Sequence, residues 1–250
     1  MSDRQLACRL APVALLAALV AAPVGAATGE LERLLAASDP FAAVPTELRV
    51  ELVFSAVASE ARVPIELWRK GDELALVRFL APKDRGKFVV RRDRAFYFLS
   101  PNARSPVKLA PALAPAGGAA LDDLLAVKPS RDYAIESATV TGGLVTFDLV
   151  AKPGTAGPPR VRWVVDRAAR RPVRAEFRAA DGTVERLVEF KAWNAERRLE
   201  PAAIVAKDVA RGGRPLAVEF VAIEPRDVPA ALFDLTDGSA RAKLPAPAGP

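Results

Sequence analysis

The sequence predicts a mainly β protein with a few helices, in which consecutive strands form an antiparallel sheet. Three observations predict this fold class. Apolar and polar residues alternate over short runs from Glu47 onward, turns containing Gly, Asp or Pro separate these runs, and helical spacing is confined to a few short segments. The alternating runs amount to about ten or eleven strands. A chain of 250 residues accommodates them in one domain.

The first 27 residues have the order of a secretory signal peptide. Arg4 and Arg9 precede a nearly all-apolar run over 10–22, and small residues at 24–27 supply a cleavage site. The run falls short of the roughly 20 apolar residues of a membrane-spanning helix. We therefore expect residues 1–27 to be cleaved rather than kept as an anchor, and the mature protein to be exported to the periplasm.

A single domain is expected over 28–236. It starts with a short amphipathic helix over 30–37, which Ser38-Asp39-Pro40 ends. Strands joined by tight turns follow at 47–56, 63–68, 74–80, 88–91, 95–99 and 107–109.

The second half of the domain begins after an Ala-, Pro- and Gly-rich stretch at 109–120, which is expected to be a loop or lid. A short helix over 121–127 follows. Further strands are expected at 133–140, 144–150, 162–166, 173–178, 184–193, 204–209 and 216–223. After a helical turn near 230–233, the Ala- and Pro-rich tail at 237–250 is expected to be disordered.

Several of these strands are apolar on both faces. Residues 74–77 (LALV) and 96–99 (FYFL) do not alternate, as a strand with one solvated face would. Something apolar must therefore cover the second face. Helices are the usual cover, but the sequence offers few of them, so an apolar binding cavity is the other interpretation.

The residue types limit the chemistry that the protein can perform. The chain has no histidine, and its one cysteine, Cys8, precedes the apolar run of the signal peptide. These absences exclude Ser-His and Cys-His nucleophiles and the common zinc and copper ligands, and no glycine-rich phosphate loop is present. We expect no metal, no cofactor and no catalysis. The formal charge of +6 is spread among acidic residues, so no nucleic-acid partner is expected of an exported protein.

Paired carboxylates are the remaining catalytic candidates. They are Asp122 with Asp123, Glu185 with Glu189, and Asp148 with Asp166. Adjacent aspartates at a helix start favour the helix dipole, and alternate glutamates mark the solvated face of a strand. An enzyme acting on envelope polymers through such a pair is therefore only a third interpretation of the sequence.

Several short motifs follow one another along the mature chain. Phe79-Leu80-Ala81-Pro82-Lys83-Asp84-Arg85-Gly86-Lys87 is followed by Phe96-Tyr97-Phe98-Leu99-Ser100-Pro101, by Asp123-Leu124, by Trp163-Val164-Val165-Asp166, by Pro172-Val173-Arg174-Ala175-Glu176-Phe177 and by Asp181-Gly182. In order and spacing they resemble the outer-membrane lipoprotein-sorting protein family, relatives of the periplasmic lipoprotein carrier and its outer-membrane receptor. The stretch at 109–120 departs from the more polar loop of that family.

The resemblance implies a strongly curved antiparallel sheet, an incomplete and open β-barrel whose concave face helices close. It also implies a monomer that carries acyl chains of lipoproteins or other lipids between membranes, with an inner-membrane transporter and an outer-membrane acceptor as partners. The apolar residues expected to line the cavity are Leu52, Phe54, Ile65, Leu67, Leu76, Phe88, Phe96, Phe98, Trp163 and Phe177.

Two basic hairpins are candidates for docking to an anionic membrane or a partner protein. One carries Arg91, Arg92 and Arg94, and the other carries Arg170 and Arg171. The simpler interpretation is that these arginines are solvated turn ends that protect strand edges.

A second interpretation of the whole protein is a periplasmic sensor or binding module. Such a module would recognise a lipoprotein or an envelope partner protein without transporting it. The sequence does not separate this interpretation from the carrier.

Overall fold

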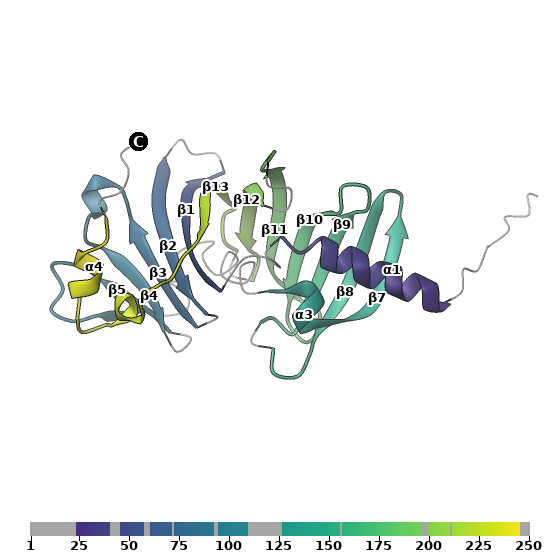
Figure 1. Ribbon diagram of the computed structural model, residues 1–250, viewed down its shortest axis with the longest axis horizontal. Coiled ribbons are helices and arrows are strands. Elements are labelled where there is room, and N and C mark those ends of the chain that lie inside the picture. The colour runs from purple at the N-terminus through teal and green to yellow at the C-terminus, as the bar shows by residue number, and fades with distance from the viewer. Residues whose placement is uncertain are drawn as a thin grey trace, which may run out of the picture.

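The computed structural model describes residues 24–40, 46–57, 61–71, 73–92, 95–109, 127–155, 157–196, 200–210 and 212–245. Thirteen strands form one antiparallel sheet (Figure 1). They are β1 (Glu47–Ala56), β2 (Arg62–Lys70), β3 (Leu74–Phe79), β4 (Phe88–Arg92), β5 (Ala95–Leu99), β6 (Val107–Leu109), β7 (Tyr133–Thr141), β8 (Leu144–Ala151), β9 (Arg160–Asp166), β10 (Arg171–Arg178), β11 (Val184–Trp193), β12 (Pro201–Asp208) and β13 (Leu216–Pro225).

The helical elements are few and mostly short. They are α1 (Val24–Ala37), the 3₁₀ turn η1 (Pro82–Asp84), α3 (Pro129–Asp132), the 3₁₀ turn η3 (Ala230–Phe233) and α4 (Ser239–Ala242). The predicted fold class, mainly β with a few helices, is confirmed. Each of the thirteen strands overlaps one of the ranges expected above, so the expected count of about ten or eleven strands was too low. Of the helix expected at 121–127, only Val127 lies within the described residues.

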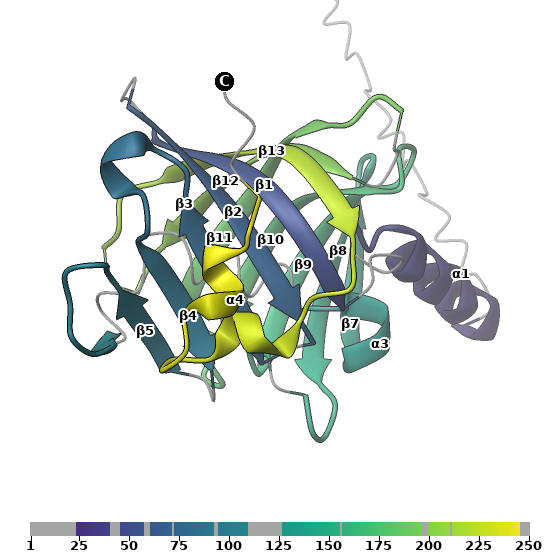
Figure 2. The same cartoon turned by 60° about the vertical axis from the view of Figure 1, so that its left-hand side comes forward.

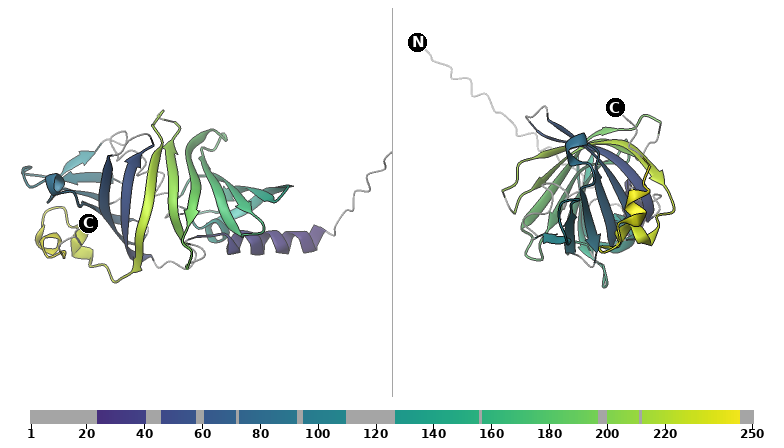
Figure 3. Two further views of the ribbon diagram at one scale, coloured as in Figure 1. Left: turned by 90° about the horizontal axis from the view of Figure 1, so that it is seen from above. Right: turned by 90° about the vertical axis from the view of Figure 1, so that its left-hand side faces the viewer.

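The strand order shows how the chain builds the sheet. It runs β6-β5-β4-β3-β2-β1-β13-β12-β11-β10-β9-β8-β7, so β1 and β13 pair at the centre and β6 and β7 form the two edges. The chain meanders outward from β1 to β6, resumes at the opposite edge with β7, and returns inward to β13. The sheet curls strongly without closing, as the end-on view in Figure 3 shows. The open, curved antiparallel sheet implied by the resemblance is therefore confirmed.

One face of the sheet, here called the inner face, carries the main hydrophobic core. The strand register places Leu67 opposite Val50 and Val77, and Trp163 opposite Phe147, so apolar side chains run across the strands in rows. Buried residues from β1–β3 and from β7–β13 belong to one continuous cluster. The inner core therefore extends without a break over neighbouring strands from β3 to β7.

The opposite face, here called the outer face, carries a second buried apolar cluster over β2–β5. There Trp68, Leu76 and Val90 are buried against Leu232 and Phe233 of η3. Figure 2 shows the C-terminal segment (228–245), in yellow, crossing this part of the sheet. The cover explains why residues 74–77 are apolar throughout: Ala75 and Val77 face the inner core, whereas Leu74 and Leu76 face the C-terminal segment.

The start of the expected disordered tail differs from that expectation. Residues 237–245 form α4 and the turn after it, and Arg241 is buried. The Arg241 guanidinium donates to the carbonyls of Leu232 and Asp234. Disorder was expected because Ala and Pro dominate the composition of the tail. The hydrogen bonds of the single buried Arg241 order this segment, and composition gives no sign of them.

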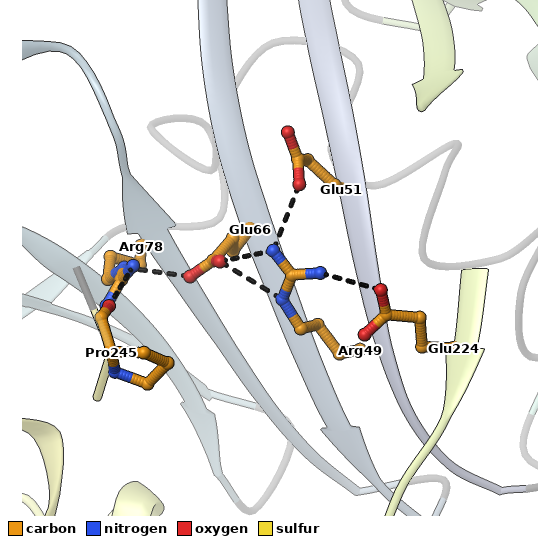
Figure 4. Close-up of polar contacts among 6 residues, drawn as sticks. All are labelled: Arg49, Glu51, Glu66, Arg78, Glu224 and Pro245. Carbon is orange, nitrogen blue, oxygen red and sulfur yellow. Dashed lines mark hydrogen bonds and ion pairs between the residues drawn. The ribbon is translucent and has the colours of Figure 1, made fainter. Parts of the chain in front are cut away.

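A buried ion-pair network ties the C-terminal segment to the sheet (Figure 4). Glu66 Oε1 accepts from Arg49 Nη2 at 2.6 Å, and Glu66 Oε2 lies 2.8 Å from Arg78 Nε. The other end of the Arg78 guanidinium donates to the Pro245 carbonyl at 2.8 and 2.9 Å. The Glu66 side chain is only 2 % exposed, so its charge depends on both arginines.

The pKa values of the two arginines in this network shift in opposite directions. Burial lowers the pKa of Arg78, and Glu66 only partly offsets this effect. Burial also acts to lower the pKa of Arg49, but the carboxylates of Glu66, Glu51 and Glu224 outweigh it, so the pKa of Arg49 is raised. Both remain cationic at any physiological pH.

The network predicts that Glu66→Gln destabilises the protein strongly. Loss of the carboxylate leaves two buried arginine charges without their common partner, which costs about 3 to 5 kcal/mol. The free energy of unfolding from urea denaturation measures the effect. The matched control is Glu219→Gln, which breaks the exposed Arg62–Glu219 pair and costs at most about 1 kcal/mol. Equal destabilisation by the two variants would contradict the buried network.

Candidate functional site

The inner face is the candidate binding surface, and its two halves differ in how they are covered. Over β7–β10, helix α1 lies across the sheet, as Figure 1 shows. Leu31, Leu34 and Leu35 of α1 pack against the inner core, and Leu35 is almost fully buried. Here the helix fills the inner face with its own side chains.

Trp163 and Ser38 fix the end of α1 on the sheet. The Trp163 indole N–H donates to Ser38 Oγ at 3.2 Å, and Ser38 Oγ donates to the Leu35 carbonyl at 2.9 Å. Both side chains are buried. Trp163 also contacts Phe190 edge to face, with ring centroids 5.9 Å apart. Trp163 therefore acts here as an anchor for the helix.

The half of the inner face formed by β1–β6 carries apolar side chains that are only partly buried. We call Phe54, Val77, Phe96, Phe98 and Val107 the inner-face patch. The register places Phe98 opposite Val89 on β4 and Val107 on β6, and Val89 opposite Val77 on β3. Val107 is 50 % exposed, and the three phenylalanines are half-buried. A row of apolar side chains on this half therefore retains accessible surface.

The structure places the ten predicted cavity residues on two faces. Leu52, Ile65, Leu67, Trp163 and Phe177 are buried in the inner core, and Phe54, Phe96 and Phe98 lie half-buried on the same face. Leu76 and Phe88 lie on the outer face with the C-terminal segment, separated from the others by the sheet. Successive side chains of a strand point to opposite faces of the sheet. Following this alternation from Ile65 through the turns would have placed Leu76 and Phe88 on the other face.

The two basic hairpins share one end of the sheet. In an antiparallel sheet, strands an even number of positions apart run in the same direction, and β4 and β9 are eight positions apart in the strand order. The β4–β5 and β9–β10 turns therefore leave the sheet at the same end. Arg92 and Arg170 are exposed there, whereas Arg171 lies over the Trp193 ring at 5.3 Å. Arg94 lies outside the described residues.

The carboxylates considered for acid–base chemistry have structural partners. Arg162 donates to Asp148 at 2.7 Å, and this hydrogen bond lowers the pKa of Asp148. Asp166 accepts from the backbone N–H groups of Ala168 and Ala169 in the β9–β10 turn. Glu189 pairs with Lys191 at 2.6 Å, and Asp122 and Asp123 lie outside the described residues. Within the described ranges, no group of three or more His, Cys, Asp and Glu could hold a metal ion.

Sequence reasoning did not identify the contribution of the C-terminal segment. Val228, Leu232 and Phe233 are almost fully buried and close the outer face of β2–β4. Their spacing over 228–233 resembles a short helical turn, which was expected, but nothing local shows which face of the sheet such a turn covers.

Comparisons with known proteins agree with this architecture. No protein-family model and no curated protein matches the sequence. Among solved structures, a LolA superfamily protein from Nitrosomonas europaea is similar with a TM-score of 0.59 at 17% identity, covering 81% of this chain and 97% of that chain. An outer membrane lipoprotein-sorting protein domain from Vibrio parahaemolyticus is similar with a TM-score of 0.53 at 11% identity, covering 82% and 94%.

A third similar structure comes from a family that is not named after lipoprotein sorting. A DUF1329 family protein from Desulfovibrio piger has a TM-score of 0.51 at 13% identity, covering 85% of this chain and 97% of that chain. At such low identities, these structures show a shared fold. The fold that the motifs of residues 79–87 and 96–101 implied is thereby confirmed.

The anchoring role of Ser38 predicts a loss of stability in Ser38→Ala. The substitution leaves the buried Trp163 N–H without its acceptor, which costs about 1 to 3 kcal/mol. Urea denaturation followed by tryptophan fluorescence measures the loss. Ser105→Ala, at an exposed position, changes stability by no more than about 0.5 kcal/mol. If the two variants were equally stable, α1 would not depend on this hydrogen bond.

Proposed function

We propose that the protein is a non-catalytic periplasmic carrier that binds acyl chains of lipoproteins or other lipids on its inner face and moves them between membranes. The observation that carries this proposal is the inner-face patch, a set of partly exposed apolar side chains on one half of a curved sheet whose other half is filled by α1. The fold shared with lipoprotein-sorting proteins supports it.

The energetics of the patch suit a carrier. Each buried methylene contributes about 0.8 kcal/mol, so full burial of a chain of about twelve methylenes gives roughly 10 kcal/mol before the cost of ordering it. A surface that is already partly shielded captures only part of this energy. The ligand therefore binds but can still leave for an acceptor.

Export of the protein rests on the pattern of residues 1–27. The α1 residues that pack on the sheet, from Leu31 onward, follow the proposed cleavage site at 24–27. Cleavage thus leaves the packing part of α1 in the mature chain. No helix in the described part of the chain is long and apolar enough to cross a membrane.

Substitution in the inner-face patch is expected to weaken acyl binding without unfolding the protein. We expect Phe54→Ser combined with Phe98→Ser to lower the affinity for a fluorescent twelve-carbon acyl probe about tenfold, since two half-buried rings lose their contact with the chain. Fluorescence titration measures the affinity, and circular dichroism checks the fold. The matched control is Val221→Ser on β13, whose side chain is 55 % exposed.

A transfer assay separates the carrier from the sensor. The protein is incubated with donor vesicles containing a diacylated lipopeptide and with acceptor vesicles lacking it. Faster transfer, lost in the Phe54→Ser/Phe98→Ser variant, is the result expected of a carrier. Tight binding of a single envelope protein with no transfer and no probe uptake would instead identify a sensor.

Membrane docking through the basic end of the sheet is a separate part of the proposal. Arg92→Gln with Arg170→Gln should weaken binding to vesicles containing phosphatidylglycerol by roughly thirtyfold, because each surface arginine contributes about 1 kcal/mol. Vesicle co-sedimentation at low and high salt measures this. Arg62→Gln with Arg214→Gln removes the same charge from the opposite end of the sheet. Equal losses in the two double variants would rule out docking through the hairpins.

A further inference from the structure

A cavity of about 670 Å³ opens on the outer face, away from the inner-face patch. It lies between the ends of β3 and β5, the turn after η1, and α4 with the residues that follow it. This volume is in the range of small-molecule binding sites. The C-terminal segment forms one wall, so the cavity exists only while that segment covers the sheet.

The walls of the cavity combine apolar side chains with arginine. Phe88, Leu99 and Leu244 contribute apolar surface. Arg78, Arg85 and Arg241 supply guanidinium groups, and none of the lining residues in the described part of the chain is acidic. A site with this composition complements a ligand that has an apolar body and a negative end.

The three arginines differ in how far their charge is already compensated. Arg78 is paired with Glu66, and burial lowers its pKa. Burial also lowers the pKa of Arg241, while Asp234 and Asp237 partly offset the effect. Arg85 is exposed and has no ion-pair partner among the residues that the structure describes. Arg85 is therefore the cation that remains available to a ligand.

The floor of the cavity is shaped by a close backbone approach. Gly86 has a φ of 80°, and a Cβ atom there would lie 2.7 Å from Pro101 Cγ. Only glycine allows the turn after η1 to pack this tightly on the end of β5. Lys87 pairs with Asp84 at 2.8 Å and holds the same turn. Arg85 thus sits on a turn whose conformation is fixed from both sides.

We infer that this outer-face cavity binds a single-chain amphiphile with an anionic head group, the chemistry of a fatty-acid carboxylate. The chain lies between Phe88, Leu99 and Leu244, and the head group lies at Arg85. This site is distinct from the inner-face patch and does not depend on the proposed carrier function.

Dodecanoate, titrated calorimetrically into the mature protein below its micelle concentration, tests the inference. Dodecyltrimethylammonium, which has the same chain and a positive head, is expected to bind at least about tenfold more weakly. Arg85→Gln should weaken dodecanoate binding about tenfold, whereas Lys83→Gln, an exposed lysine in the same turn, should leave it unchanged. Equal binding of both amphiphiles, or no effect of Arg85→Gln, overturns the proposal.

A second, independent experiment fills the cavity with a larger side chain. Ala242 lines it and is exposed, so Ala242→Trp places an indole in the cavity without disturbing the core. Dodecanoate binding is expected to be lost in this variant and kept in Lys243→Trp, which adds the same ring at an exposed neighbour that does not line the cavity. Binding that survives Ala242→Trp overturns the proposal.

Photo-crosslinking with a diazirine-labelled fatty acid locates the bound chain. Crosslinks at Leu99 and Leu244 support the outer-face site. Crosslinks confined to Phe96 and Phe98, with binding lost in Phe54→Ser/Phe98→Ser and unaffected by Arg85→Gln, overturn it and leave the carrier function standing. Repeating the titration with lysophosphatidate shows whether the site binds a fatty acid or an anionic lysolipid more tightly.

Discussion

The pairing of β1 with β13 is the interaction on which the rest of the structure depends. It joins two meanders, β1–β6 and β7–β13, into one curved sheet and so creates the continuous inner core. The same ladder places the C-terminal segment: Glu47, at the start of β1, accepts from the backbone N–H of Val228 directly after β13. The hydrogen bond from the Lys70 ammonium, and after it the one from Val228, lower the pKa of Glu47. Both faces of the sheet are thus organised from one pair of strands.

Most of the fold could be predicted from the sequence because its main signal, period-two alternation, is local. Most strands were located from that signal, the doubly apolar β3 and β5 from the turns that bound them, and a helix ending before Ser38 was expected from helical spacing. The pairing of β1 with β13 and the covering of the outer face were not predictable in this way. They join residues more than a hundred positions apart. In the sequence, Glu66 and Arg78 resemble ordinary solvated strand residues, and only the structure shows that both are buried and that Arg78 binds the Pro245 carbonyl.

The candidate site could be predicted in part. Eight of the ten expected cavity residues share the inner face, because large apolar side chains on a curved sheet gather where solvent is excluded. Leu76 and Phe88 lie on the outer face, which strand parity distinguishes but apolar character alone does not. Full burial of Trp163 and Phe177 also shows that an aromatic residue expected in a binding cavity can instead complete the core. The side chains of the inner-face patch could be told apart from the buried core only from their exposed surface in the structure.

The late position of β13 in the chain has a consequence for how the protein folds. The edge of β1 that β13 occupies stays open until residues 216–225 have been synthesised, so the central ladder cannot form on a nascent chain. Contacts of such long sequence separation also form slowly. Folding of the whole sheet therefore waits for its last strand. The strand order that gives the protein its curvature therefore also delays completion of the sheet until most of the chain has been synthesised.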